Sequence, residues 1–415
     1  MLVDFDLVVQ GQAGGGRTAK ALADAVRDWF QEEYRPLVVA SRTAVDGRGA
    51  AAARIHLHPV DPGVRFHVSA RGVVTVRADV LPVGPGFHVF LVGALQALGE
   101  TQDIAWVGLP RVGPRDASEH AQERLMNVAR DVLDGLAAGV GGPRSLMLPL
   151  HERFSHDSLV ATPLGPRDMA WLARAAIGGH VLRDVFPWPE PGFGPRYTRG
   201  RALSLMWMHV RWRAPRDGDE RRLLEVVDGL MLDAWQGEPN QALPWAEWAE
   251  IRSLLGIEDE HSPEITRRLA DEQPRDVVGY RRHPVSIRLP AGWWVTVPGE
   301  LATSWEDRVT WRADGETGSV RLSVLSGMER SAQPLPVRAM NANQLVHREG
   351  GRHGAAVFES VPGGAWTLRG RMRSDGGEVR IDIELAPGVE RAIAADIFRS
   401  LCWLDPDAGL RASRT

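Results

Sequence analysis

Titratable side chains that could transfer protons are densest in one short segment of the chain. Residues 151–157 read His-Glu-Arg-Phe-Ser-His-Asp, and they supply the candidates His151, Glu152, His156 and Asp157. Clustered histidines and carboxylates are typical of acid–base catalytic sites. His88, in the first turn of a helix predicted at 87–98, is a fifth candidate for the same site. The spacing matches no nucleophile or metal motif, so a solvated polar loop is the alternative, and the residues name no reaction.

A glycine-rich stretch between a predicted strand at 2–9 and a predicted helix at 18–29 could cradle a phosphate group. It reads Gly-Gln-Ala-Gly-Gly-Gly-Arg-Thr and fits a phosphate-loop pattern in which arginine replaces the usual lysine. The candidate binding residues are Gly11, Gly16, Arg17 and Thr18. A nucleotide site also needs an acidic residue after a later strand to hold magnesium, but the next apolar run ends in Ser41 and Arg42. A plain glycine-rich turn is therefore the alternative.

Three histidines on neighbouring predicted strands are candidate metal ligands. His56 and His58 are two residues apart and would share one face of a strand, and His67 lies on the next strand. Two such histidines can begin a zinc or iron site, but a third converging ligand is required and no acidic residue follows at a suitable spacing. A half-exposed sheet face is the alternative, and we expect neither a bound metal nor a cofactor.

The charged composition argues against a general affinity for nucleic acid. The formal charge is −4, and Lys20 is the only lysine among 49 basic residues, so the other 48 are arginine. This usage is typical of a bacterial genome rich in G and C, and it weakens the case that pairs such as Arg221–Arg222, Arg267–Arg268 and Arg281–Arg282 bind phosphate. We therefore expect no nucleic-acid partner.

Cysteine usage and apolar runs predict a cytoplasmic protein. The lone Cys402 cannot form an internal disulfide or a cysteine-rich zinc site. The first ten residues contain Asp4 and Asp6 and have no basic start, which is unlike a signal peptide. The longest apolar run, at 86–98, is shorter than a membrane-spanning helix, so no membrane span is expected.

Periodicity and chain length together predict an α+β protein of two domains. At 415 residues the chain exceeds one ordinary core. Residues 1–255 are expected to form a mixed sheet with covering helices, 256–279 an acidic linker, 280–404 a mostly antiparallel sandwich, and 405–415 a tail. Predicted helices lie at 18–29, 87–98, 116–138, 168–176, 220–235, 245–255 and 390–403, and predicted strands at 2–9, 36–40, 54–60, 64–79 with a turn at 70–73, 146–150, 203–212, 285–290, 293–297, 307–312, 319–326, 355–359, 366–372 and 379–385.

Two resemblances add to this pattern. Residues 280–404, through Leu-Pro-Ala-Gly-Trp at 289–293 and Ile-Phe-Arg-Ser-Leu at 397–401, resemble the Mog1/PsbP/DcrB α/β sandwich. That likeness implies a domain that binds partners or acts as a chaperone or accessory subunit, with no shared catalytic residues. Residues 1–255 are similar to an uncharacterised bacterial family, through the motifs at 82–88, 186–188 and 243–248, and this implies a cytoplasmic bacterial protein without an assigned activity.

The leading hypothesis is a non-enzymatic interaction protein, such as an adaptor, a chaperone or an immunity-type accessory protein. Fifteen tryptophans against three tyrosines motivate it, because tryptophan supplies large apolar area at interfaces as well as in cores. A protein partner is expected. The first alternative is an enzyme with an acid–base or metal site near His88 and residues 151–157, and the second is nucleotide binding at 11–18.

Overall fold

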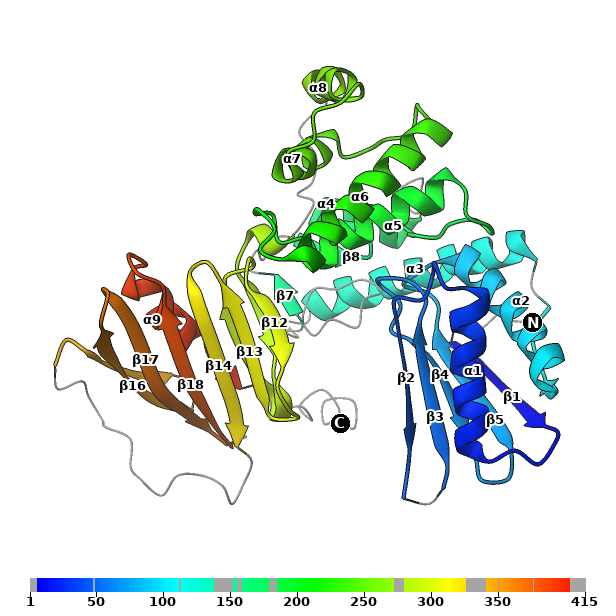
Figure 1. The fold of residues 1–415 in the computed structure, drawn as a ribbon, viewed down its shortest axis with the longest axis horizontal. Helices are drawn as coiled ribbons and strands as arrows, with labels where there is room; N and C mark the ends of the chain where they lie inside the picture. The colour runs from blue at the N-terminus through cyan, green and yellow to red at the C-terminus, as the bar shows by residue number, and fades with distance from the viewer. Residues whose placement is uncertain are drawn as a thin grey trace. The chain divides into compact units, whose positions relative to one another are not determined.

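The fold is that of a computed structural model, which describes residues 6–47, 49–111, 113–137, 152–154, 159–178, 185–271, 280–325, 341–349, 351–375 and 377–403. The chain divides into two compact units (Figure 1). The first unit comprises residues 1–149 and 158–280, and the second comprises 150–157 and 281–415. Helices and antiparallel sheets occur in both units, so the predicted α+β class with two domains is confirmed. No helix in the described ranges is long and apolar enough to cross a membrane.

A six-stranded sheet is the centre of the first unit. Its strand order is β2-β3-β4-β5-β1-β6, and every pairing within it is antiparallel, whereas the sequence predicted a mixed sheet. Strands β5 and β6 run in the same direction, but β1 lies between them and pairs antiparallel with each. No parallel pairing therefore forms. The strands are β1 (Asp6–Ala13), β2 (Ala40–Val45), β3 (Ala51–His56), β4 (Val64–Val68), β5 (Val73–Asp79) and β6 (Ile104–Val107).

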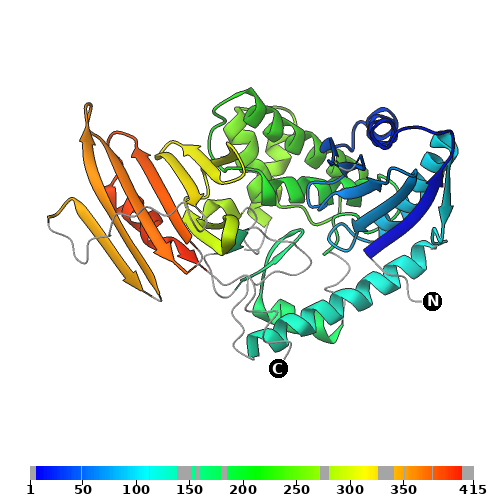
Figure 2. The ribbon, with the colours of Figure 1, turned by 90° about the horizontal axis from the view of Figure 1, so that it is seen from below.

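Helix α1 (Ala19–Glu33) lies over one face of this sheet, as Figures 1 and 2 show. Its buried residues recur at helical spacing, from Leu22 through Val26 to Trp29 and Phe30, as the sequence predicted. Thr18 caps the helix by accepting a hydrogen bond from the Ala21 amide at 3.2 Å. The inward residues of the strands meet this stripe, and their outward residues face away from it.

Helix α2 (Pro85–Gln102) contributes an almost wholly apolar element to the same core. It begins two residues before the predicted start, with Gly84 as N-cap and Pro85 in its first turn, and packs against α3 (Pro114–Ala137) and β6. Helix α4 (Met169–Ile177) packs on α3, and Asp168 caps it by accepting from the Trp171 amide at 2.6 Å. A two-stranded hairpin of β8 (Leu159–Thr162) and β9 (Gly165–Asp168) precedes it.

Four further helices of the first unit surround a second apolar cluster, and two of them correct the sequence prediction. The strand predicted at 203–212 lies largely in α5, because five consecutive residues from Leu203 to Trp207 are buried and such a run has no visible helical stripe. The linker predicted at 256–279 contains α8, which places Ile265 in the cluster. The helices are α5 (Pro195–Met208), α6 (Gly218–Gly237), α7 (Trp245–Leu255) and α8 (Ser262–Asp271).

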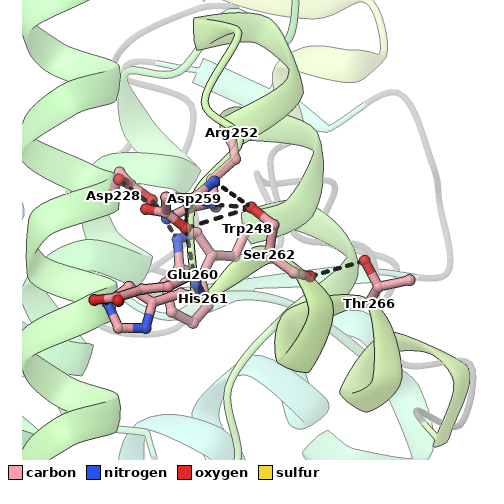
Figure 3. A network of polar contacts seen from close by, with 8 residues as sticks. All are labelled: Asp228, Trp248, Arg252, Asp259, Glu260, His261, Ser262 and Thr266. Carbon is pink, nitrogen blue, oxygen red and sulfur yellow. Dashed lines mark hydrogen bonds and ion pairs between the residues drawn. The ribbon is translucent and has the colours of Figure 1, made fainter.

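A polar network fixes the α7–α8 connection, as Figure 3 shows. The Arg252 side chain is only 4% exposed and forms ion pairs with Asp228 on α6 at 3.2 Å and with Asp259 at 2.5 Å. Asp228 also accepts a hydrogen bond from the Trp248 indole at 2.6 Å. Helix α8 buries only one residue, Ile265, in the apolar cluster. The buried Arg252, through its ion pair with Asp259, fixes the loop that leads into this helix.

The second unit contains a seven-stranded antiparallel sheet and a smaller four-stranded one. Helix α9 (Arg391–Ser400) packs against β11, β17 and β18. The four-stranded sheet has the order β19-β11-β10-β7, with β7 (Glu152–Phe154), β10 (Val285–Arg288), β11 (Trp293–Val297) and β19 (Cys402–Trp403). The larger sheet has the order β12-β13-β14-β18-β17-β16-β15, with β12 (Ala302–Trp305), β13 (Thr310–Gly315), β14 (Gly318–Leu325), β15 (Gln344–Glu349), β16 (Arg352–Val361), β17 (Ala365–Ser374) and β18 (Gly377–Leu385).

Two predictions for this unit change in detail. The closing helix predicted at 390–403 ends at Ser400, and Cys402, half-buried, pairs in β19 instead. The polar loop predicted at 151–157 contains β7, which pairs with β10, a contact between distant parts of the chain that no local pattern indicates. The strand predicted at 146–150 and the tail at 405–415 lie outside the described residues.

Candidate functional site

The residues of the predicted phosphate loop have structural roles. Gly11 lies inside β1, paired with Val74 on one side and Trp106 on the other, so the loop is shorter than the motif requires. The Arg17 guanidinium donates to the side chain and the carbonyl of Gln102 at 2.8 and 2.6 Å, and Thr18 caps α1. Gly16 adopts a positive φ of 61° in the remaining turn. The structure thus uses these residues to attach the β1–α1 turn to the end of α2.

The three histidines proposed as metal ligands do not converge. Strand β3 ends at His56, which hydrogen-bonds the Asp61 carbonyl through Nδ1 at 3.0 Å, and His58 lies beyond the strand in the core, 1% exposed. His67 is exposed on β4 opposite Ala52, four residues along β3 from His56 and hence about 13 Å away. Among the described residues, no three His, Cys, Asp or Glu side chains form a metal-binding group.

The catalytic candidates belong to different units. His88 is fully buried in the first turn of α2, where burial, together with the charge of the neighbouring His120, lowers its pKa to about 4. Glu152 lies on β7 of the second unit. His151, His156 and Asp157 lie outside the described residues.

The turn before His88 is a packing junction between two of the sequence motifs. A Cβ atom on Gly86 would come within 2.2 Å of the Glu190 carbonyl oxygen, and one on Gly84 within 2.7 Å of the Trp188 carbonyl oxygen. The Trp188 amide donates to Val83 at 2.8 Å, and the Gly86 amide donates back to Trp188 at 3.0 Å. The motifs at 82–88 and 186–188 therefore meet in space, and glycine permits their backbones to touch.

The tryptophans that motivated the interaction hypothesis are mostly core residues. Nine of the fifteen are buried, among them Trp188, Trp207 and Trp248, and only Trp305 on β12 is exposed, by 48%. Most of the tryptophans therefore fill the cores of the two units, and their number does not indicate a broad aromatic interface.

The most distinctive surface feature of the first unit is a row of arginines on the outward face of its sheet. Arg42 on β2 lies opposite Arg54 on β3, Arg54 opposite Arg65 on β4, and Arg65 opposite Arg77 on β5. We call these four residues the arginine row. Because neighbouring strands are about 4.8 Å apart, the row extends about 14 Å across the sheet.

The arginine row has carboxylates near it but no ion-pair partner within the described part of the chain, since Asp61 acts on Arg54 and Asp79 on Arg65 only at longer range. No guanidinium group of the row is within ion-pair distance of a described carboxylate, and Arg42, Arg65 and Arg77 are exposed. The half-buried Arg54 donates to the Pro62 carbonyl, while its buried Nε has no partner. Partial burial and the charges of Arg42 and Arg65 lower the pKa of Arg54. Like charges opposite one another on adjacent strands oppose folding, so the row has a cost that an anionic ligand would remove.

A shallow concavity of about 650 Å³ accompanies the row. All four arginines line it, together with the small residues Ala44 and Ala52 and the polar residues His67 and Thr75. Guanidinium groups bind carboxylates and phosphates through paired hydrogen bonds, and neighbouring alanines give a ligand room to approach them. The arrangement can therefore hold an extended anionic surface.

The arginine row could not be found among arginines adjacent in sequence, which were the only ones considered as a basic cluster. The members of the row are eleven or twelve residues apart, and only strand register brings them together. The available signal was that Arg54, Arg65 and Arg77 alternate with inward apolar residues and so take outward positions.

Protein-family models and curated proteins provide no precedent for this surface. No protein-family model matches the chain, and no curated protein is detectably similar to it. The two resemblances stated from the sequence motifs therefore stay predictions, and the function is inferred from the geometry of the site.

Replacing one central member of the row should stabilise the first unit. We expect Arg65→Thr to raise its free energy of unfolding by about 0.5 kcal/mol at low salt, because the change removes two like-charge pairs at a strand position that suits threonine. The gain should shrink at about 1 M salt, where charges are screened. Denaturant unfolding at the two salt concentrations measures both the gain and its decrease. The control is Arg369→Thr on β17, whose guanidinium pairs with Glu359 and Asp382 and which should give no gain.

Acidification should destabilise the first unit through His58. Burial, aided by the charge of Arg201, lowers the pKa of His58 to about 3 from 6.5. Between these values the unfolded chain binds a proton that the folded unit excludes, so the stability present above about pH 6.5 falls as the pH falls, by about 2 kcal/mol at pH 5. We expect His58→Gln to lose about 2 kcal/mol less than the wild type between pH 7 and pH 5 in denaturant unfolding. An equal loss in both proteins would contradict a neutral buried histidine.

Proposed function

We propose that this protein is a non-enzymatic interaction protein that binds an acidic protein partner through the arginine row. The single observation that carries the proposal is the alignment of four arginines, none in an ion pair with a described carboxylate, on one open sheet face. Selection for stability alone would place an acidic or neutral residue opposite at least one of them. A partner with several carboxylates would relieve the repulsion when it binds, and would gain speed of association from the concentrated charge.

The composition of the concavity supports binding rather than chemistry. The residues that line it are four arginines, three alanines, one buried phenylalanine, His67 and Thr75. This set supplies hydrogen-bond donors for an anion but no carboxylate that could act beside His67 as a general base or orienting group.

We also propose the remaining features of the sequence-based interpretation. The second unit is a Mog1/PsbP/DcrB-like sandwich, supported by β10, the following Leu-Pro-Ala-Gly-Trp segment and the closing helix α9. The protein is a cytoplasmic bacterial accessory protein, supported by its arginine-rich composition and single cysteine. Exposed Trp305 gives the second unit an apolar contact point of its own.

Binding of labelled poly-L-glutamate, followed by fluorescence anisotropy at about 50 mM NaCl, tests the proposed function. We expect the wild-type protein to bind and the variant Arg54→Ala/Arg65→Ala to bind about tenfold more weakly, because two ion pairs are lost at the centre of the row. The matched control is Arg221→Ala/Arg222→Ala on α6, which removes the same charge from another exposed surface. The control should bind like the wild type. An equal loss in both variants, or no binding by the wild type, would contradict the proposal.

A further inference from the structure

The spacing of the arginine row identifies the shape of its ligand. Arginines on adjacent strands are about 4.8 Å apart, and the four follow one line across the strands rather than along one of them. In an α-helix, residues three or four positions apart lie on one side and are separated by about 5 Å along the axis. Four acidic residues at i, i+4, i+7 and i+11 therefore span about 16 Å, close to the length of about 14 Å covered by the row.

We propose that the partner presents an α-helix with an acidic stripe, laid along the arginine row across β2, β3, β4 and β5. This inference rests on the proposed function and adds the shape of the partner. The helix would carry four carboxylates over three turns, one for each of Arg42, Arg54, Arg65 and Arg77. Its small residues would face Ala44 and Ala52, whose short side chains give the concavity its room.

An extended peptide fits the row less well. Its side chains on one side repeat about every 6.8 Å, so successive carboxylates would move out of step with arginines that repeat every 4.8 Å or so. A helix stays closer to the spacing of the row, because its mean repeat of about 5.5 Å differs from that of the row by about 0.7 Å per contact, against about 2 Å for an extended peptide.

Single-stranded nucleic acid also fits less well. Proteins that bind it on a sheet combine basic residues with aromatic side chains on which the bases stack. The outward positions of β2 to β5 hold alanine, arginine, histidine, threonine, one valine and one aspartate but no aromatic residue, and Phe66 points into the core.

Four labelled probes of equal charge test the inference with the full-length protein. The first peptide carries four glutamates in the stripe, and the second has the same composition with the glutamates on different sides of the helix. The third is the stripe peptide with a central proline, which abolishes its helix. The fourth is an oligothymidylate. Circular dichroism confirms equal helix content in the first two, and anisotropy gives the dissociation constants of all four probes.

We expect the stripe peptide to bind at least about fivefold more tightly than the other three probes, because only it can engage all four arginines at once. Arg54→Ala/Arg65→Ala should remove this preference, and Arg221→Ala/Arg222→Ala should keep it. Equal, arginine-dependent binding of all three peptides would overturn the helix and leave acidic binding in place. Tightest binding of the oligothymidylate would overturn the helix in favour of nucleic acid. Absence of binding by every probe would overturn the proposed function as well.

Discussion

Gly86→Ala is expected to lower the free energy of unfolding of the first unit by about 3 kcal/mol. The new methyl group would lie 2.2 Å from the Glu190 carbonyl oxygen and 2.5 Å from the Trp188 ring. Trp188 cannot move aside easily, because it is fully buried among Phe87, Phe90, Phe193 and Tyr197 and its backbone is bonded to both sides of the turn. Denaturant unfolding followed by tryptophan fluorescence would measure the loss.

Gly93→Ala in the same helix is the matched control. A Cβ at Gly93 would meet no atom within 4 Å, and the residue is exposed with ordinary helical geometry. Alanine is the better helix former, so this variant should gain about 0.5 to 1 kcal/mol. Glycine-to-alanine substitutions at these two positions, seven residues apart, are therefore expected to change the free energy of unfolding in opposite directions. A loss below about 1 kcal/mol for Gly86→Ala would contradict the close contact between the two motifs.

Arg252→Ala should also destabilise the first unit by about 3 kcal/mol, because it leaves Asp228 largely buried without its cation. Asp228 would retain the Trp248 indole as a donor, which limits the loss. The network that joins α8 to α6 and α7 would be broken at its centre (Figure 3). We expect α8 to detach first, so amide hydrogen exchange at residues 262–271 should accelerate before the rest of the unit unfolds.

The control for this prediction is Arg267→Ala on α8. Its guanidinium pairs with Glu264 at 2.5 Å but is 58% exposed, and exposed pairs contribute little to stability. We expect a change within about 0.5 kcal/mol and unaltered exchange. If Arg252→Ala were equally neutral, the desolvated ion pairs would not be what holds α8 in place.

The parts of the fold that local patterns predicted are those with one buried face. The stripe of α1 and the alternation of β10 each follow from a single period, and α7 begins and ends at its predicted residues, Trp245 and Leu255. The pattern misidentified α5, whose residues 202–207 are all buried, and missed α8, which buries only Ile265 and follows a loop fixed by the Arg252–Asp259 ion pair. Strand β7 depends on pairing with β10, more than 130 residues away, and no local pattern encodes that pairing.

The candidate site shows the same division between local and long-range information. Alternation places Arg54, Arg65 and Arg77 on the outward face of their strands, and this much could be predicted. Whether they align depends on the register of three successive pairings, in which a slip of one residue would turn every side chain to the other face. For the glycine-rich stretch, the local pattern predicted a site that the structure does not form. Gly11 belongs to strand β1, and only the strand pairing shows this.

The measurement that tests the arginine row most directly is the binding of labelled poly-L-glutamate to the variant Arg42→Gln/Arg54→Gln/Arg65→Gln/Arg77→Gln. Glutamine keeps hydrogen-bonding capacity and removes only the charge. We predict that the folded variant shows no measurable binding at about 50 mM NaCl, while the wild type binds with an affinity that falls steeply as salt is added. A dissociation constant within twofold of the wild-type value would contradict the assignment of this sheet face as the binding surface.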